Sequence, residues 1–379
     1  MELGVERLLT QNRQLLKGKR VGLVTNYAVT DRKFRLVVDL LIEAKEWLVT
    51  KLFGPEHGML GCAKEGEHVH STVDPHTGLT AYSLYGDIQK PTAEMLENLD
   101  ILVVDLIDIG VRYWTNIATT LYCIEACAEL GMPCIILDRP NPISGVMREG
   151  NLLNLKFQSF VGFLAIPNRH GLTNGELALF YNSQLEKTCD LKVIPCSGWE
   201  RSQMQPDTDI PLVSPTPNTT RFDMMLLYAG TCLFEGTNIS EGRGTAHPFE
   251  VIGAPFANAH KVADIFNKSG LPGVIARPTY FVPTYKKYVG EVCEGVQLHV
   301  TDRTALKAVK TGLVLLEIFA RLYPKNFEFL PPRAEDGRRF IDLLSGDDKL
   351  CRLVEIGRTN EYLQDLSHFN STIQPFYLY

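Results

Sequence analysis

The sequence lacks the glycine-rich motifs that bind nucleotide phosphates. The expected strand at 20–26 is followed by the turn 27–31, which contains no glycine. A dinucleotide fingerprint needs glycines at this turn so that the backbone can approach a pyrophosphate. The P-loop pattern G-x-x-x-x-G-K-S/T is also absent from the 379 residues. We therefore expect a Rossmann-like sheet that binds no nucleotide, and we expect no cofactor.

The sequence also lacks a basic region and a long apolar run. The net charge is −6 and no block rich in lysine and arginine occurs, which argues against a nucleic-acid partner. No apolar run approaches the length that spans a membrane, so we expect no membrane partner. The sequence carries no signal for an oligomeric state.

Cysteines occur without any close pair. There are nine, an odd number, with no C-x-x-C, and several lie in apolar segments, among them Cys123, Cys127, Cys134 and Cys232. This pattern is typical of buried thiols in a reducing compartment and argues against a disulfide framework or a zinc site. The segment 1–7 contains acids and no apolar core of a signal peptide. We expect a cytoplasmic protein; an exported form whose leader has been removed is the alternative.

The length favours two domains, because 379 residues exceed the size at which a single core usually keeps growing. The composition shifts to Pro, Ser, Thr and Asp at 202–220, as in an inter-domain connection. We place the boundary there, with domains at 1–215 and 216–379.

Apolar strands alternate with amphipathic helices in the first part of the chain, which predicts an α/β fold with a Rossmann-like parallel sheet. The segment 101–106 is apolar throughout, as in a parallel strand covered on both faces. Shorter strands in the second part indicate a smaller, mixed α/β C-terminal domain. The main expected strands are 20–26, 47–53, 101–106, 133–138, 273–276 and 295–300, and the main expected helices are 34–44, 117–130 and 305–322.

Three successive expected strands of the first domain end in an acid. In open α/β sheets, ligands bind at the carboxyl ends of the strands, where a desolvated carboxylate can serve as a general acid. The alternative is a structural role, in which these acids cap turns or form Asp–Arg pairs. The residues expected at this edge are Glu56, His57, Asp105, Asp108, Arg112, Asp138, Arg139 and Asn141.

A glycine-rich polar stretch, 234–245, lies in the second domain and would let the backbone approach a ligand. It could mimic a phosphate cradle, but Glu235 and Glu241 would repel an anion. Carboxylates among Asn, Ser, Thr and Arg suit a neutral polyhydroxylated ligand better.

A long polar connection, 58–78, follows the first acid, and loops of this length inside a domain are usually functional. We expect it to form a flap over the site. His68, His70 and Asp74, with His57, suggest a metal-dependent hydrolase as an alternative. No further ligand has recognisable spacing, so we expect no metal.

Five separated motifs, in the same order, resemble those of the NamZ family of exo-acting β-N-acetylmuramidases. The resemblance covers nearly the whole chain. It implies a Rossmann-like N-terminal domain, a smaller C-terminal domain and an active site in the cleft between them. It also implies release of N-acetylmuramic acid from the non-reducing end of peptidoglycan-derived glycans, with Glu56 as the catalytic glutamate. The motifs are 52–58, 104–112, 137–142, 169–171 and 235–245.

Glycoside hydrolysis usually needs two carboxyl groups that flank the scissile bond. We expect Glu56 to be the general acid, with a pKa raised by burial beneath the flap. Glu241 is the candidate for the second carboxylate, and Asp105, Asp108 and Asp138 are its competitors. Catalysis assisted by the substrate's N-acetyl group is also open. A carboxyl separation of about 5–5.5 Å would predict retention, and about 6.5–9.5 Å inversion.

The lactyl carboxylate of muramic acid calls for a cation, and the fork of an arginine fits it best. Arg112, Arg139, Arg169 and Arg243 are the candidates. The competing interpretation is a cleft that binds a muropeptide or sugar acid without cleaving it, although clustered acids argue against this. Two further residues of the matching motifs complete the expected substrate-binding set: His170 and Asn238.

Overall fold

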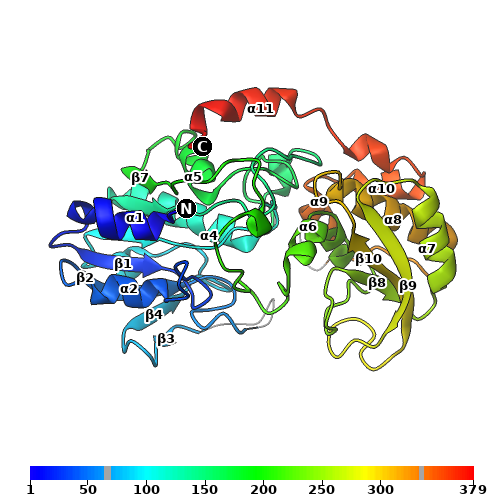
Figure 1. The fold of residues 1–379 in the computed structure, drawn as a ribbon, viewed down its shortest axis with the longest axis horizontal. Helices are drawn as coiled ribbons and strands as arrows, with labels where there is room; N and C mark the ends of the chain where they lie inside the picture. The colour runs from blue at the N-terminus through cyan, green and yellow to red at the C-terminus, as the bar shows by residue number, and fades with distance from the viewer. Residues whose placement is uncertain (64–69, 333–336) are drawn as a thin grey trace.

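The computed structural model describes residues 1–63, 70–332 and 337–379, which form two bodies side by side (Figure 1). The first body contains a seven-stranded sheet of order β3-β4-β2-β1-β5-β6-β7. Every neighbouring pair is parallel except β3 and β4. The strands are β1 (Arg20–Val24), β2 (Leu48–Gly54), β3 (Thr72–Val73), β4 (Thr80–Ser83), β5 (Ile101–Val104), β6 (Cys134–Leu137) and β7 (Leu191–Ile194).

Alternating side chains of the central strands divide between two hydrophobic clusters, one on each face of the sheet. In β5, Leu102 and Val104 join one cluster, whereas Ile101 and Val103 join the other. This period of two on a strand buried on both faces confirms the expected covered parallel sheet. The helices of this body are α1 (Gly4–Gln11), α2 (Val37–Glu43), α3 (Ala93–Leu96), α4 (Thr115–Leu130) and α5 (Asn174–Asn182).

The helix expected at 34–44 begins only at Val37. Phe34 has a φ of 62°, and the Asp31 carboxylate accepts hydrogen bonds from the backbone N–H groups of Lys33 and Arg35. This local turn competes with the first helical turn, because an aspartate side chain can replace helical partners of the backbone.

The second body contains an antiparallel sheet of order β8-β10-β9 with helices packed on it. Helices α6 and α8 approach so closely that a Cβ on Gly230 would lie 2.1 Å from the Ala308 carbonyl oxygen. Its elements are α6 (Phe222–Thr231), β8 (Val251–Ala254), α7 (Ala259–Lys268), β9 (Val274–Phe281), β10 (Cys293–Val300), α8 (Ala308–Leu322), α9 (Phe340–Ser345) and α10 (Leu350–Glu355). The short 3₁₀ turns of the chain are η1 (Arg13–Leu15), η2 (Leu155–Phe157), η3 (Gln205–Asp207), η4 (Cys232–Gly236), η5 (Thr359–Tyr362) and η6 (Gln374–Phe376).

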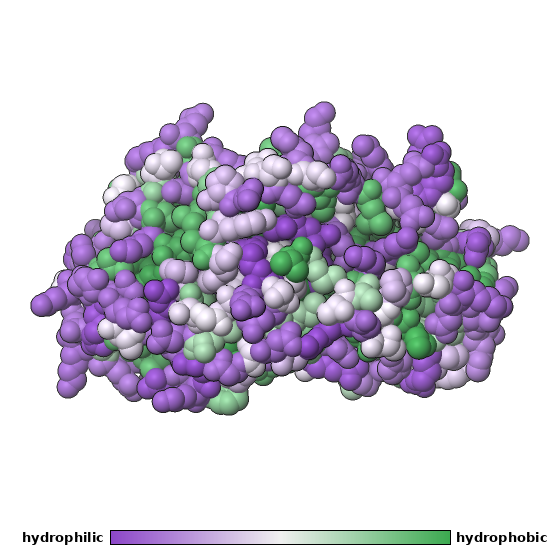
Figure 2. Space-filling view, turned by 45° about the horizontal axis from the view of Figure 1, so that its top comes forward, coloured by the Kyte–Doolittle hydropathy of each residue, from purple (hydrophilic) through white to green (hydrophobic). Residues whose placement is uncertain are grey.

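The architecture confirms the predicted fold class, a mostly parallel α/β sheet followed by a smaller mixed domain. The division at 215/216 stays a prediction. Over the part of the chain that the structure describes, no helix is long and apolar enough to cross a bilayer. Hydrophilic side chains predominate on the face drawn in Figure 2, with hydrophobic ones in smaller groups between them.

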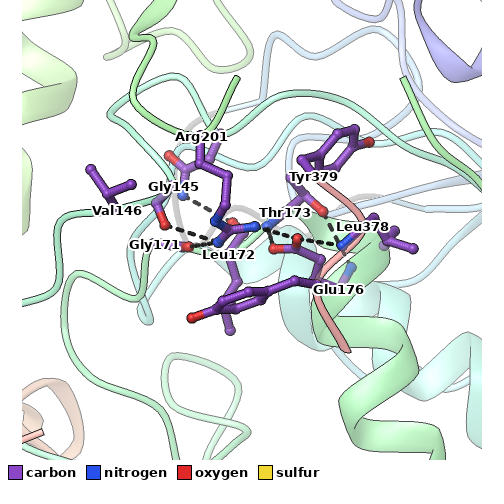
Figure 3. Close-up of polar contacts among 12 residues, drawn as sticks. Gly145, Val146, Gly171, Leu172, Thr173, Glu176, Arg201, Leu378 and Tyr379 are labelled. Carbon is purple, nitrogen blue, oxygen red and sulfur yellow. Dashed lines mark hydrogen bonds and ion pairs between the residues drawn. The ribbon is translucent and has the colours of Figure 1, made fainter. Parts of the chain in front are cut away.

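The end of the chain returns from the second body to the first through α11 (Ser367–Ile373), the red helix at the top of Figure 1. The Leu378 N–H donates to Glu176 Oε1 at 3.0 Å, and the Tyr379 hydroxyl donates to Asp138 Oδ2 at 2.7 Å. Figure 3 shows Leu378 beside Glu176, whose carboxylate also pairs with Arg201. The last residues therefore complete a buried polar network of the first body.

We predict that Tyr379→Phe destabilises the protein by about 1–2 kcal/mol, because the hydroxyl both donates to Asp138 and accepts from the Cys196 N–H. Urea unfolding followed by fluorescence measures this as a lower midpoint. Tyr280→Phe is the matched control, since Tyr280 is exposed on β9. Equal midpoints for the two variants would contradict the role assigned to Tyr379.

Candidate active site

A cavity of about 780 Å³ is lined by residues of both bodies and of the connection between them. The first body contributes Glu56 and His57, and the second contributes Glu241 and Arg243. A volume of this size lies within the range that holds a small ligand. The polar and charged residues that line it are Glu56, His57, Gln89, Thr115, Thr216, Asn218, Thr219, Glu235, Asn238, Glu241, Arg243, Lys286 and Lys287.

Glu56 follows β2 after a sharp turn at its end. A Cβ on Gly54 would lie 2.6 Å from the Met59 backbone nitrogen, so the turn requires glycine at this position. The Glu56 side chain is 9% exposed, and the Thr115 hydroxyl at the start of α4 donates to its Oε2 at 2.7 Å. The carboxyl group is thus positioned at the cavity wall. Its protonation stays a prediction.

His57 lies next to Glu56 at the cavity wall. Its Nδ1 is 2.7 Å from the Ala63 carbonyl oxygen, a contact that fixes the ring against the following turn. Asn238 also lines the cavity. It is held by the backbone around Glu328, whose N–H donates to Asn238 Oδ1 at 3.0 Å.

The part of the cavity wall that belongs to the second body carries two carboxyl groups and two cations. Glu241 Oε2 lies 2.7 Å from Lys287 Nζ, and Glu241 Oε1 lies 3.5 Å from Arg243 Nε. Arg243 also pairs with Glu235 at 3.1 Å and stacks over the Phe249 ring at 4.8 Å. Each carboxylate therefore contacts a cation, as buried charges require.

The two carboxyl groups of this wall differ in their protonation equilibria. Burial pushes the pKa of Glu241 upward, but Lys287 and Arg243 outweigh it and hold this pKa below its usual value. Burial raises the pKa of Glu235, and the neighbouring Glu241 adds to the rise, against the opposing effect of Arg243. Glu241 is therefore the stronger acid of the pair.

Eight predicted site residues do not line this cavity, although the strands that precede six of them do end at the same edge of the sheet. The side chains are turned into buried contacts with other protein groups instead of toward Glu56. The eight are Asp105, Asp108, Arg112, Asp138, Arg139, Asn141, Arg169 and His170.

Five of these residues form pairs or hydrogen bonds within the first body. Asp105 is 1% exposed and pairs with Arg139, whose Nη2 lies 3.1 Å from Oδ2. Asp108 Oδ2 lies 3.2 Å from His170 Nε2. Asn141 Nδ2 donates to the Leu172 carbonyl oxygen, a bond that shapes a turn. Contacts of this kind correspond to the structural alternative, in which the acids at the strand ends hold turns or form Asp–Arg pairs.

Arg112 and Arg169 connect the two bodies. Arg112 is 2% exposed and donates to the Ile166 carbonyl in the first body and to the Ser345 carbonyl at the end of α9, at 2.8 and 2.6 Å. Arg169 pairs with Glu149, whose carboxylate accepts the first two N–H groups of α8 at 3.1 Å each. Both arginines therefore position the walls of the cavity without reaching it.

The residues of the metal alternative are not brought together in the part of the chain that the structure describes. His68 lies outside the described residues. Both Asp74 oxygens accept from the Tyr27 hydroxyl at 2.8 Å, and His70 is exposed. Among residues 1–63, 70–332 and 337–379, no group of three or more His, Cys, Asp or Glu side chains is arranged to hold a metal ion.

Several cavity residues were not assigned from the sequence. Glu235 lies in the glycine-rich segment 234–245, but the sequence indicated only that its carboxylate would repel an anion. Lys287 lies 46 positions after Glu241. No local pattern connects them, because the contact exists only after the β9–β10 connection folds against the glycine-rich segment. The only indication that the sequence gave for Thr115 was its position near the start of a helix.

The buried carboxyl group of Asp138 is expected to make the stability of the fold depend on pH. Burial raises its pKa to about 7, although Thr173, Tyr379 and the Gly175 N–H donate to the carboxylate. The folded protein thus retains a proton that the unfolded chain loses at about pH 4. The stability from this proton is complete below that pH and is lost as the pH rises through 7.

Asp138→Asn removes this titration. We expect the free energy of unfolding of the wild type, relative to the variant, to rise by roughly 2–4 kcal/mol between pH 7.5 and 4.5. Urea unfolding across this range measures it, with Asp190→Asn, an exposed site, as the control. A difference that is constant over the range would refute the assignment.

A model described as "Exo-beta-N-acetylmuramidase NamZ, N-terminal" matches residues 21–223, and the corresponding C-terminal model matches residues 226–379. The peptidoglycan beta-N-acetylmuramidase NamZ of Bacillus subtilis (strain 168) is 42% identical over 384 residues, which cover 100% of this chain and 91% of that protein.

Solved structures give the same relationship. Two DUF1343 family proteins from Bacteroides fragilis NCTC 9343 superpose over 100% of this chain and 98% of their own. One is 34% identical with a TM-score of 0.90, and the other is 29% identical with a TM-score of 0.77. The resemblance seen in the five motifs is confirmed, and the chain belongs to the exo-β-N-acetylmuramidase NamZ family.

Proposed function

We propose that this chain is an exo-acting β-N-acetylmuramidase that releases N-acetylmuramic acid from the non-reducing end of peptidoglycan fragments. The observation that carries the proposal is the pair Glu56 and Glu241, which come from different bodies and line one cavity. Most glycoside hydrolases use two carboxyl groups that flank the scissile bond. Membership of the NamZ family supplies the substrate class.

Glu56 is assigned the role of general acid. It gives its proton to the glycosidic oxygen as the bond from that oxygen to C1 breaks, while the Thr115 hydroxyl holds Oε2 in place. Positive charge develops on the sugar ring in this step. The anionic Glu241 stabilises that charge from the opposite wall.

Glu241 then has two possible chemical roles. In a retaining enzyme its carboxylate forms a bond to C1, and water later cleaves this ester with Glu56 acting as base. In an inverting enzyme Glu241 takes a proton from the water that attacks C1. A third route uses the substrate's N-acetyl oxygen as the nucleophile and leaves Glu241 to stabilise the charged ring.

For the compartment we propose the cytoplasm, with an exported mature form as the alternative. Eight of the nine cysteines are buried thiols, as is typical of proteins in a reducing environment. The remaining one, Cys62, is exposed.

The first test is Glu56→Gln, which keeps the shape of the side chain and removes its proton. We expect release of the chromophore from a β-N-acetylmuramide to fall by about 10³-fold or more, because the proton transfer to the leaving oxygen is lost. Glu43→Gln, at an exposed site on α2, is the control and should match the wild type.

Circular dichroism and the thermal midpoint establish that the Glu56 variant remains folded. A folded wild type that binds the sugar and releases nothing, from this probe or from a longer glycan, would indicate the binding protein of the competing interpretation. Cleavage that persists in Glu56→Gln would move the acid role to another group.

The second test addresses Glu241 with Glu241→Gly and added azide. If Glu241 is a nucleophile, we expect azide to restore turnover and to yield the α-glycosyl azide, because the small anion attacks C1 from the vacated side. Proton NMR of the wild-type reaction gives the anomer released first. Release of the α-anomer without azide rescue would assign Glu241 as the base of an inverting enzyme.

A further inference from the structure

Glu235 is a carboxyl group at the cavity that the proposed mechanism does not use. It belongs to the short turn η4, and its side chain is 16% exposed. The turn packs closely on α9, since a Cβ on Gly236 would lie 2.5 Å from the Ile341 side chain. This packing fixes the backbone beside Glu235 and holds its carboxyl group at the cavity wall.

Several arginines of this protein hold a single carboxylate with two donors. The Nε and Nη2 groups lie on the same edge of the guanidinium, and this edge matches the two oxygens of a carboxylate. Arg20 donates in this way to Asp100 at 3.1 and 2.9 Å. Arg339 donates likewise to Asp342 at 3.1 and 3.2 Å. The bidentate pair is therefore the ordinary arrangement for this edge.

Arg243 divides the same edge between two carboxyl groups. Its Nη2 donates to Glu235 Oε1 at 3.1 Å, and its Nε lies 3.5 Å from Glu241 Oε1. The guanidinium lies over the Phe249 ring, with Cζ 4.8 Å from the ring centroid. Glu235 thus takes the donor that would otherwise complete a bidentate pair between Arg243 and Glu241.

The pKa of Glu241 depends on how the cations contact it. Burial acts to raise this pKa, but Lys287 and Arg243 outweigh burial and hold it below its ordinary value. A second donor from Arg243 would lower the pKa further, because it would favour the ionised form. The same donor would neutralise more of the negative charge that Glu241 presents to the cavity.

Neutral and charged groups both face Glu235. The Cys232 thiol donates to Glu235 Oε1 at 3.4 Å, and Tyr228 also faces this carboxyl group. Burial raises the pKa of the thiol and of the phenol, so both stay neutral near pH 7. Burial also raises the pKa of Glu235, although Arg243 opposes the rise and the negative charge of Glu241 adds to it. A glutamine therefore resembles the protonated form of Glu235, since its amide oxygen can accept from Arg243.

We propose that Glu235 is a positioning residue that keeps Arg243 from forming a bidentate pair with Glu241. The inference rests on the proposed function. Glu241 needs its negative charge in each of the roles considered for it, as nucleophile, as base or as stabiliser of the charged ring. A guanidinium that gave both donors of its edge to Glu241 would weaken all three roles. Glu235 therefore supports hydrolysis through Arg243 and Glu241.

The first test is Glu235→Met, which keeps the length of the side chain and removes the oxygen that accepts from Arg243. We expect kcat for a chromogenic β-N-acetylmuramide to fall by about 10- to 30-fold, with KM within about twofold of the wild type. The acid limb of the kcat/KM profile reports the ionisation of Glu241 and should move down by about 0.5–1 pH unit. Glu186→Met, at an exposed site, is the control and should match the wild type.

Glu235→Gln keeps an oxygen for Arg243, so its kcat should stay within about threefold of the wild type and its acid limb should not move. Glu235→Asp withdraws the carboxyl group by one methylene and should shift the limb in the same direction as Glu235→Met, by less. This variant keeps the test open if the methionine variant does not fold. A loss of kcat with an unmoved acid limb would indicate a purely structural role and overturn the inference. A methionine variant that matches the wild type would overturn it too.

Carbon-13 NMR of the glutamate carboxyl groups separates this inference from the proposed function, because it needs no turnover. The signal of Glu241 Cδ is the one that disappears in Glu241→Gln. Its titration midpoint should be lower in Glu235→Met than in the wild type by about 0.5–1 pH unit. Glu56, His57 and Lys286 also line the cavity, and they are common to both proteins.

Equal midpoints in the wild type and Glu235→Met would overturn the role of Glu235. A lowered midpoint in a protein whose wild type hydrolyses no muramide would overturn the proposed function alone.

Discussion

A site shared by two bodies depends on the contacts that fix one body against the other. In this chain the central contact is the Arg169–Glu149 ion pair, because the Glu149 carboxylate also receives the first two N–H groups of α8. Those N–H groups have no partner within the helix, and the positive end of the helix dipole favours an anion there. Arg112 adds a second link by donating to the Ser345 carbonyl. Both links are buried, so water does not compete for them.

The two carboxyl groups that the proposed mechanism uses have different contacts. Glu241 contacts two cations, Lys287 and Arg243, and the Thr115 hydroxyl donates to Glu56. An acid and an anion are what hydrolysis of a glycoside requires on opposite sides of the bond. Each body thus provides one of the two carboxyl groups, and the association of the bodies brings both groups to one cavity.

Much of the fold was accessible from the sequence because local patterns determined it. The apolar segment 101–106 predicted a strand covered on both faces, and Gly54-Pro55 predicted the turn that presents Glu56. The sequence could not separate residues that reach the cavity from residues that position its walls. Arg112 and Arg243 carry the same guanidinium, and only their partners in the folded chain, Ser345 for one and Glu235 for the other, distinguish their roles. Lys287 carried no local signal at all, since its contacts depend on where the connection between β9 and β10 folds.

The return of the chain end to the first body sets an order of events during synthesis. Asp138 and Glu176 emerge from the ribosome roughly two hundred residues before Tyr379 and Leu378, their partners. The first body must therefore collapse around two buried acids that still lack these donors. Its polar network closes only after residues 378 and 379 have left the ribosome. Co-translational folding of the first body is thus incomplete until nearly all of the second body has been synthesised.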